Sequence, residues 1–222
     1  MLHEEYGLEA ARFLEKTYGM PYLSHFPPFG FEGTREWLLN VADHFGCTKE
    51  ANEFITAEER RIYPRIIQAD QYLTGRKMAV YADPTISLGI TRLGAEMGMV
   101  PVLTGFTVEN EGCRRKLDEI IERYEISPQV LEEDNINFKF LAQDLKPHLI
   151  FGTSLHYELA VALGAFFYAI NYPTSQRLRV FDIPLMGYQG LLYTVQQIGD
   201  EMLKQDLFDE MVHEARHVDE KD

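Results

Sequence analysis

The residues best suited to catalysis or metal binding are a few histidines, serines and cysteines, and their spacing limits what they can do. His213-Glu214-Ala215-Arg216-His217 matches HExxH, a helical pattern in which two histidines bind zinc and the glutamate acts as a base. A catalytic zinc helix lies under a cleft, whereas this motif lies in a charged tail and contains an arginine. We therefore expect a solvent-exposed helix rather than a zinc peptidase.

A second pattern, Gly152-Thr153-Ser154-Leu155-His156, follows a predicted strand and begins a predicted helix. Hydrolases place their nucleophilic serine at such a turn, but His156 replaces the second glycine of GxSxG. Ser154 and His156 are two residues apart, which puts them on different sides of a helix. A serine that caps the helix or faces a ligand is the more common case, and a hydrolase is the less favoured interpretation.

The remaining candidates are weaker. Arg177 and Arg179, beside Asp182, could clamp an anion, although surface ion pairs are the more frequent meaning of such a cluster. Neither GxGxxG nor GxxxxGK[ST] occurs, so the sequence has no nucleotide-binding fingerprint. Cys47 and Cys113 are far apart and form no CxxC, which argues against both a disulfide framework and a cluster site. The isolated histidines fit packed or surface positions better than a metal site; they are His25, His44 and His148.

The elements that must position these residues are clearest in Gly75–Gly105. Apolar runs at Met78–Ala82 and Val100–Leu103 predict two strands, and the helical spacing of apolar residues in Thr85–Met97 predicts a helix between them. Two strands joined so closely through a helix lie parallel with a right-handed crossover, so this stretch is one βαβ unit. Ligands of such sheets bind where the strands end, here around Asp83 and Gly105.

The alternation of helices and strands continues along the chain. We expect further helices at Glu4–Tyr18, Thr34–Phe45, Thr56–Leu73 with a kink at Pro64, Cys113–Tyr124, Ile136–Leu145, Leu155–Leu163 and Gly187 to about Lys204. We expect further strands at Pro21–Phe26, Gln129–Leu131, Pro147–Phe151 and Ala165–Ile170. The expected fold class is α/β, with Rossmann-like open parallel sheets flanked by helices. Residues 1–74 would form an N-terminal α/β piece with a bridging helix, residues 75–186 a Rossmann-like domain, and residues 187–222 a helix with an acidic tail.

Composition excludes some partners. The chain has 222 residues, of which 45% are hydrophobic, so a packed core is expected. Its net charge is −14, from 35 acidic and 21 basic side chains, and this charge repels nucleic acid and anionic membranes. The sequence shows neither an apolar run long enough to span a bilayer nor a signal peptide, and we therefore expect a cytoplasmic protein.

Five segments, in this order, resemble the second half of nitrogenase component 1 subunits. They are LEAARFLEKTYGMPYL, PPFGFEGTREWL, GRKMAVYADPTISLGITRLGAEMGMVPV, KPHLIFGTS and NYPTSQRLRVFDIPLMGYQG. The family includes nitrogenase, the scaffolds that assemble its cofactor, and the protochlorophyllide and chlorophyllide reductases that work in the dark. The resemblance covers about Gly7 to Gln205, and it implies the last two of the family's three Rossmann-like domains without the first.

The resemblance also has implications for cofactors. In the family, the first domain carries the cysteines of the bridging iron–sulfur cluster, and one cysteine and one histidine of the α-type subunit hold a cofactor of its own. Ala11 stands at the position that matches that cysteine, and Tyr172–Gly190 contains no histidine. An alanine and this loop, apart from Asp182, would ligate a soft iron–sulfur cofactor poorly. The resemblance therefore implies a β-type or scaffold portion that has no metal ligand and binds no cluster alone.

By the same resemblance, the chain would pack against an α-type subunit, in a homo- or hetero-oligomer, within an electron-transfer complex served by an ATP-dependent iron–sulfur reductase. It would have no catalytic residue and would not be redox-competent alone. The candidates for lining its cleft are Asp83, Pro84, Gly105, Gly152, Thr153, Ser154, Arg177, Arg179 and Tyr188. The alternative is a free-standing, non-catalytic α/β scaffold or small-ligand-binding protein.

Overall fold

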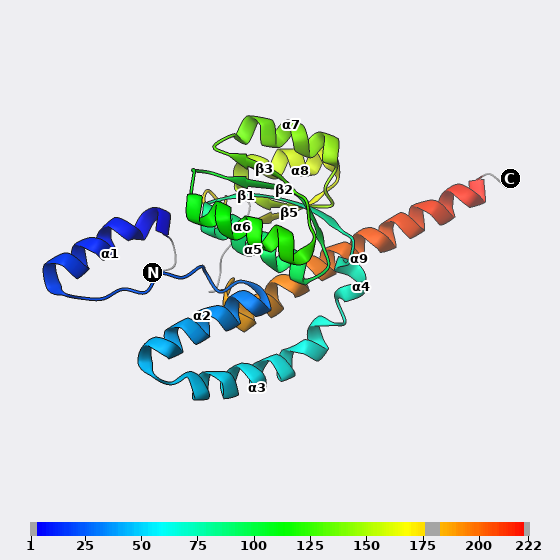
Figure 1. The fold of residues 1–222 in the computed structure, drawn as a ribbon. Coiled ribbons are helices and arrows are strands. Elements are labelled where there is room, and N and C mark those ends of the chain that lie inside the picture. Colours follow the sequence, from blue (N-terminus) through cyan, green and yellow to red (C-terminus); the bar gives the residue numbers. More distant parts are fainter. Residues whose placement is uncertain (1–3, 176–182, 220–222) are drawn as a thin grey trace.

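The computed structural model describes residues 4–175 and 183–219, and a parallel sheet of five strands forms its centre (Figure 1). The strands are β1 (Lys77–Ala82), β2 (Val100–Phe106), β3 (Gln129–Glu132), β4 (Leu149–Gly152) and β5 (Phe166–Ala169). Their spatial order is β3-β2-β1-β4-β5, and every neighbouring pair is parallel. The expected α/β class with an open parallel sheet is confirmed.

Helices cover both faces of this sheet. On one face lie α5 (Pro84–Glu96) and α6 (Glu111–Tyr124), and on the other lie α7 (Asn135–Leu145) and α8 (Tyr157–Leu163), as Figure 1 shows. Met78 and Val80 of β1 belong to the core cluster that includes α5, whereas Ala79 and Tyr81 belong to the cluster that includes α7 and α8. Burial on both faces explains why β1 is an uninterrupted apolar run rather than an alternating one.

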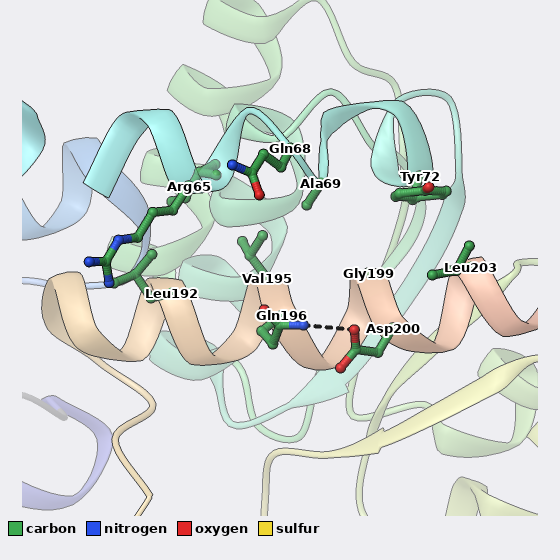
Figure 2. Close-up of a pocket in the computed structure, with 11 residues that line it drawn as sticks. Arg65, Gln68, Ala69, Tyr72, Leu192, Val195, Gln196, Gly199, Asp200 and Leu203 are labelled. Carbon is green, nitrogen blue, oxygen red and sulfur yellow. Dashed lines mark hydrogen bonds between the residues drawn. The ribbon is translucent and has the colours of Figure 1, made fainter. Parts of the chain in front are cut away.

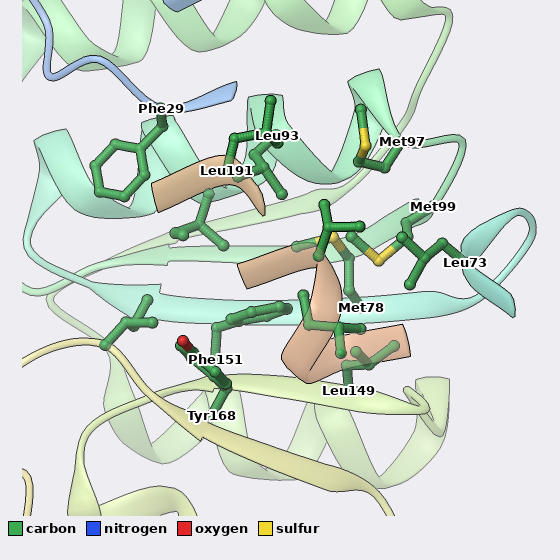
Figure 3. Close-up of a cluster of buried hydrophobic side chains, with 14 of the residues drawn as sticks. Phe29, Leu73, Met78, Leu93, Met97, Met99, Leu149, Phe151, Tyr168 and Leu191 are labelled. Carbon is green, nitrogen blue, oxygen red and sulfur yellow. The ribbon is translucent and has the colours of Figure 1, made fainter. Parts of the chain in front are cut away.

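Of the helices outside the βα units, α2 (Gly30–Phe45), α3 (Thr48–Ile66), α4 (Asp70–Leu73) and α9 (Gly187–Asp219) pack on the α5 side. The N-terminal helix α1 (Glu4–Tyr18) extends away from this core and reaches the sheet domain through Glu5 and Tyr6 (Figure 1). Figure 3 shows part of the resulting core, which includes Leu191 of α9, Phe151 and Tyr168 of the sheet, and Phe29 and Leu73 of the N-terminal segment. One core cluster thus connects all three parts that the sequence suggests. The division at residues 75 and 187 stays a prediction.

Two predictions about the N-terminal segment were wrong. Pro21–Phe26 is not a strand, because no strand of the sheet lies beside it and prolines remove backbone donors within it and directly after it. The long helix does not begin at Thr56, since α3 starts eight residues earlier, at Thr48, and the spacing that resembled a capping box lies inside it. Pro64 lies one turn from the end of α3, and a turn at residues 67–69 separates α3 from α4.

Two features elsewhere differ in detail. The segment after β4 begins as a 3-10 turn, η1 (Ser154–His156), before α8, and α9 continues well beyond Lys204. Among the helices that the structure describes, none has both the length and the apolar character needed to cross a membrane.

A buried ionic cluster fastens α2 to the sheet domain. Arg92 of α5 is only 6% exposed, and its guanidinium donates two hydrogen bonds to the carboxylate of Glu36, at 2.6 and 2.8 Å. It also contacts Glu32 at 3.2 Å and Glu96 at 3.4 Å. Tyr124 of α6 donates to Glu32 at 2.6 Å. We call Arg92, Glu32, Glu36, Glu96 and Tyr124 the Arg92 cluster.

Glu96 binds the start of α2 directly. Its carboxylate accepts hydrogen bonds from the backbone N–H groups of Phe31, at 2.6 Å, and Glu32, at 3.2 Å. These groups have no partner within their own helix, and the positive end of the helix dipole favours a carboxylate there. Gly30, with φ of 73°, lies so close that a Cβ would be 2.2 Å from Glu96 Oε2. Burial raises the pKa of Glu96 to about 7.

We predict that Arg92→Met destabilises the fold strongly, because the variant leaves the buried carboxylate of Glu96 and the partly buried one of Glu36 without their cation. The expected loss in unfolding free energy is about 3–5 kcal/mol, measured by urea denaturation. Arg61→Met is the matched control, since Arg61 pairs with Glu58 on the exposed side of α3, and it should change stability little. Similar midpoints for the two variants would show that the cluster contributes no more than a surface pair.

Candidate functional site

The candidate site lies where β1 and β4 end. These strands are neighbours, and the chain leaves β1 towards α5 on one face and β4 towards α8 on the other. Such a switch point forms the crevice in which open parallel sheets bind ligands. The structure brings six of the predicted lining residues to this edge of the sheet; they are Asp83, Pro84, Gly105, Gly152, Thr153 and Ser154.

The two glycines are there for close packing. A Cβ on Gly105 would lie 2.3 Å from the ring of Tyr81, and a Cβ on Gly152 would lie 2.7 Å from Nδ1 of His156. Neither neighbour is free to move, because Tyr81 is 5% exposed and His156 is 1% exposed. Both positions therefore require glycine for the shape of the strand ends.

Side chains of the same chain satisfy the polar groups around Asp83. Thr107, just after β2, donates its hydroxyl to Asp83 Oδ1 at 2.6 Å. Tyr6 of α1 also interacts with Asp83: partial loss of water around its hydroxyl, together with its hydrogen bond to Asp83, raises the pKa of Tyr6 to about 12, while most of the side chain is exposed. Ser87 links the two strands, because its hydroxyl accepts from the N–H of Ala82 at 3.0 Å and donates to the carbonyl of Gly105 at 2.6 Å.

A carboxylate from α1 occupies the N-terminus of α5. Glu5 Oε1 accepts a hydrogen bond from the Thr85 hydroxyl at 2.7 Å and one from the Thr85 N–H at 3.3 Å. Helix N-termini attract anions through unpaired N–H groups and the helix dipole. The structure therefore uses the anion-attracting end of α5 to hold α1 over the crevice.

Ser154 and His156 do not form a nucleophile–base pair. Ser154 Oγ accepts from the N–H and the hydroxyl of Ser175, at 2.7 and 2.9 Å. The Nδ1 atom of His156 accepts from the Thr153 N–H at 3.2 Å, and its Nε2 donates to Asn135 Oδ1 at 2.7 Å. Because both ring nitrogens are engaged, this histidine has no free nitrogen to accept a proton from Ser154, and its role is to fix the turn after β4.

Tyr188, another predicted lining residue, does not lie at this edge. Tyr188 is 5% exposed, donates its hydroxyl to Glu59 at 2.9 Å, and packs beside Phe31, so it joins α9 to α2 and α3. Arg177 and Arg179 are outside the described residues, as are the side chains of the HExxH motif.

Sequence reasoning missed the residues that close the crevice. Thr107 could have been found, because it follows a predicted strand of the βαβ unit by a few residues. Glu5 and Tyr6 gave no signal, since about 80 residues separate them from their partners Thr85 and Asp83.

The cysteines do not converge on a metal site. Cys47 is partly buried at the start of α3, whereas Cys113 is 1% exposed in an apolar cluster with Phe106 and Leu117. Within residues 4–175 and 183–219, no group of three or more histidine, cysteine or acidic residues is arranged to hold a metal ion. An iron–sulfur cluster needs several converging thiolates, and the described donors do not fit one.

Comparison with known families decides the relationship. The family described as nitrogenase component 1 type oxidoreductase matches residues 1–203. This chain belongs to that family.

Its relatives include parts of two kinds of complex. The nitrogenase molybdenum-iron protein beta chain of Methanococcus maripaludis is 29% identical over 200 residues, which cover 89% of this chain and 43% of that protein. A light-independent protochlorophyllide reductase subunit of a Bradyrhizobium species is 29% identical over 194 residues, covering 86% of this chain and 36% of that protein. The nitrogenase component 1-like chain therefore spans less than half the length of these relatives.

A solved structure supports the fold. The structure titled "Nitrogenase Cp1 at pH 6.5" superposes with a TM-score of 0.83 over 92% of this chain and 44% of that one, at 22% identity. The expected nitrogenase component 1-like fold is thereby confirmed.

We predict that acid destabilises this component 1-like chain partly through His156. Burial lowers the pKa of His156 from 6.5 to about 4. Because the folded state holds the imidazole neutral, its contribution is complete above about pH 6.5 and is lost as the pH falls towards 4; at pH 5 the loss is about 2 kcal/mol. Glu96, whose pKa is raised to about 7, contributes in the opposite direction over the same pH range. The measurement is therefore the difference in urea midpoint between the wild type and a His156 variant, which should shrink from pH 7 to pH 5.

The His156→Gln variant should be less stable at pH 7 but should lose less on acidification, whereas a variant of the exposed His44, His44→Gln, should follow the wild type. An equal acid loss in the wild type and in His156→Gln would contradict this role.

We also predict that Glu5→Gln releases α1. A carboxylate at a helix N-terminus stabilises by about 0.3–1 kcal/mol, so proteolytic cleavage within α1 should accelerate by up to about fivefold. Limited trypsin digestion at Arg12 and Lys16 measures this rate. Glu9→Gln, an exposed change on the same helix, is the control. Equal cleavage of the two variants would refute the anchoring role of Glu5.

Proposed function

We propose that this chain is a β-type portion of a nitrogenase component 1-like oxidoreductase complex and serves as its structural and partner-binding part. The observation that carries the proposal is the family match over residues 1–203, with relatives that include a nitrogenase beta chain and a protochlorophyllide reductase subunit. A cofactor-assembly scaffold is the closest variant of this role. The substrate proposed for the complex is dinitrogen or a tetrapyrrole, because a nitrogenase relative and a protochlorophyllide reductase relative both match at 29% identity.

We further propose that the iron–sulfur clusters of the complex are bound by other polypeptide segments. The separation of Cys47 from Cys113 and the presence of Ala11 on α1 support this proposal. The proposed partners are an α-type subunit and an ATP-dependent iron–sulfur reductase. A cytoplasmic location stays a prediction from the sequence.

We propose that the α-type subunit binds to the surface around the crevice, where β1 and β4 end. Large apolar side chains surround the crevice and are well exposed: Tyr6 at 66%, Leu155 at 59% and Tyr172 at 86%. Exposed apolar side chains that gather on one side of a protein are typical of interaction surfaces. Within the crevice, Asp83, Ser87 and Ser154 already have hydrogen-bond partners in the same chain, which suits a contact surface better than a reaction centre.

The alternative, a free-standing α/β scaffold, has one observation in its favour. The core cluster that joins β1, β4 and β5 to α9 and α3 contains large side chains with no exposed surface, such as Met78, Leu149 and Ile198. A core this well buried can support a stable chain without a partner. This alternative predicts a colourless homodimer that captures no α-type subunit.

The test is co-purification of the affinity-tagged chain with an α-type subunit from the same genome. We expect the chain alone to be colourless, with iron and acid-labile sulfide far below one per chain, and the iron of the co-purified complex to follow the partner. Leu155→Asp should reduce capture at least tenfold. Phe45→Asp, at an exposed position at the far end of α2, should not.

Iron–sulfur absorption from the chain alone that disappears in Cys47→Ser would contradict the assignment. A homodimer without capture would favour the scaffold alternative.

A further inference from the structure

A groove separate from the strand-end crevice lies between α3–α4 and α9 (Figure 2). Its volume is about 290 Å³. Arg76, just before β1, binds Asp206, which follows the groove along α9, at 2.6 Å. The groove therefore lies towards the amino ends of the strands, at the opposite end of the sheet from the crevice. The proposed function does not use it.

The break between α3 and α4 creates the groove. Pro64 has no N–H, and α3 ends two residues later, at Ile66. The turn at residues 67–69 follows, and here the chain touches α9 at one point and lies farther from it before and after that point. That contact is between Ala69 and Gly199, where a Cβ on the glycine would lie 3.5 Å from the Cβ of Ala69. Side chains larger than those of Ala69 and Gly199 would fill the groove.

The walls and the rim differ in chemistry. Figure 2 shows Ala69, Leu192, Val195 and Leu203 along the two sides of the groove. The polar residues at its rim are Arg65, Gln68, Tyr72, Gln196 and Asp200. Five of the eleven lining residues are polar or charged, so the groove suits a ligand that has both an apolar part and a polar group.

Arg65 is the group that selects the ligand. Arg35, Arg61 and Arg76 each bind a carboxylate of the chain, whereas the guanidinium of Arg65 has no hydrogen-bond or ion-pair partner within residues 4–175 and 183–219. On the opposite side of the groove, Asp200 already accepts a hydrogen bond from Gln196 at 2.7 Å. A guanidinium favours a carboxylate, which it can bind through two parallel hydrogen bonds.

We propose that this groove binds a small amphipathic carboxylate, with its apolar body against Val195 and Leu192 and its carboxylate at Arg65. The volume lies just below the usual range for ligand sites, about 300–1,000 Å³, and is too small to enclose a tetrapyrrole. The net charge of −14 repels anions in general, so affinity must come from local apolar contact and from Arg65. Such a ligand bridges α3–α4 and α9 and stabilises their packing.

The test measures the binding of straight-chain carboxylates to the whole purified chain. Calorimetry gives the affinity, and changes in amide NMR shifts locate the site. Butanoate, hexanoate and octanoate should bind with increasing affinity, by about fourfold per added methylene until the groove is full. Octylammonium and octanol should bind at least tenfold more weakly than octanoate. The largest shifts should fall on residues 65–72 and 192–203.

Two variants locate the site. Arg65→Gln should weaken octanoate at least tenfold, whereas Arg60→Gln, an exposed arginine on the same helix that lines a different hollow, should not. Gly199→Leu should fill the groove and abolish binding, and Gly199→Ala, which only reaches contact distance of Ala69, controls for helix packing.

Three results would each overturn the proposal. They are octanoate binding that does not saturate, octylammonium binding as tight as that of octanoate, and an octanoate affinity that is unchanged in Arg65→Gln. These results would not affect the partner-binding role, because that role is tested at Leu155.

Discussion

The burial of Arg92 among carboxylates is the interaction on which the arrangement depends. A guanidinium that is 6% exposed is costly to remove from water, and the cluster offsets this cost only while Glu32 and Glu36 of α2 stay in contact with α5. Glu96 adds a second link, because it binds the first N–H groups of α2. Apolar contacts tolerate sliding, whereas this set of directional bonds fixes one position of α2. The ion pair of Arg35 with Glu59, at 2.6 Å, then connects α2 to α3, which forms one side of the groove beside α9.

The two ends of the parallel sheet differ in how their polar groups are paired and in which side chains surround them. At the carboxyl ends of the strands, where related folds bind ligands, Glu5, Tyr6 and Thr107 satisfy the polar groups from within, and exposed apolar side chains surround them. Near the amino ends, a groove with an unpaired guanidinium remains open among the described residues. This difference supports a partner-binding role for the first end and a small-ligand site at the second. Both proposals agree with a chain whose cysteines lie apart.

The parts of the fold that could be predicted are those whose signal is local. The βαβ unit from β1 to β2 is predictable because burial on both faces makes its strands continuously apolar, and the topology rule then puts Asp83 and Gly105 at one edge. Ser154 is assigned to the same edge only by the family resemblance. Pro21–Phe26 was mispredicted because a strand needs a neighbour, which no local pattern reveals. The Arg92 cluster was missed because 56 residues separate Arg92 from Glu36, so that each looked like a surface charge. The resemblance to the family came from the order of several segments.

Native-state hydrogen exchange tests most directly whether the Arg92 cluster joins α2 and α3 to the sheet domain as one cooperative unit. The account predicts that buried amides of α2 and α3, such as Ala42 and Ile62, open with the same free energy and denaturant dependence as Val80 of β1 and Leu103 of β2. Opening of α2 and α3 at a much lower free energy, independent of denaturant, would contradict it. In that case the sheet domain would stand alone and the groove beside α9 would be only transient.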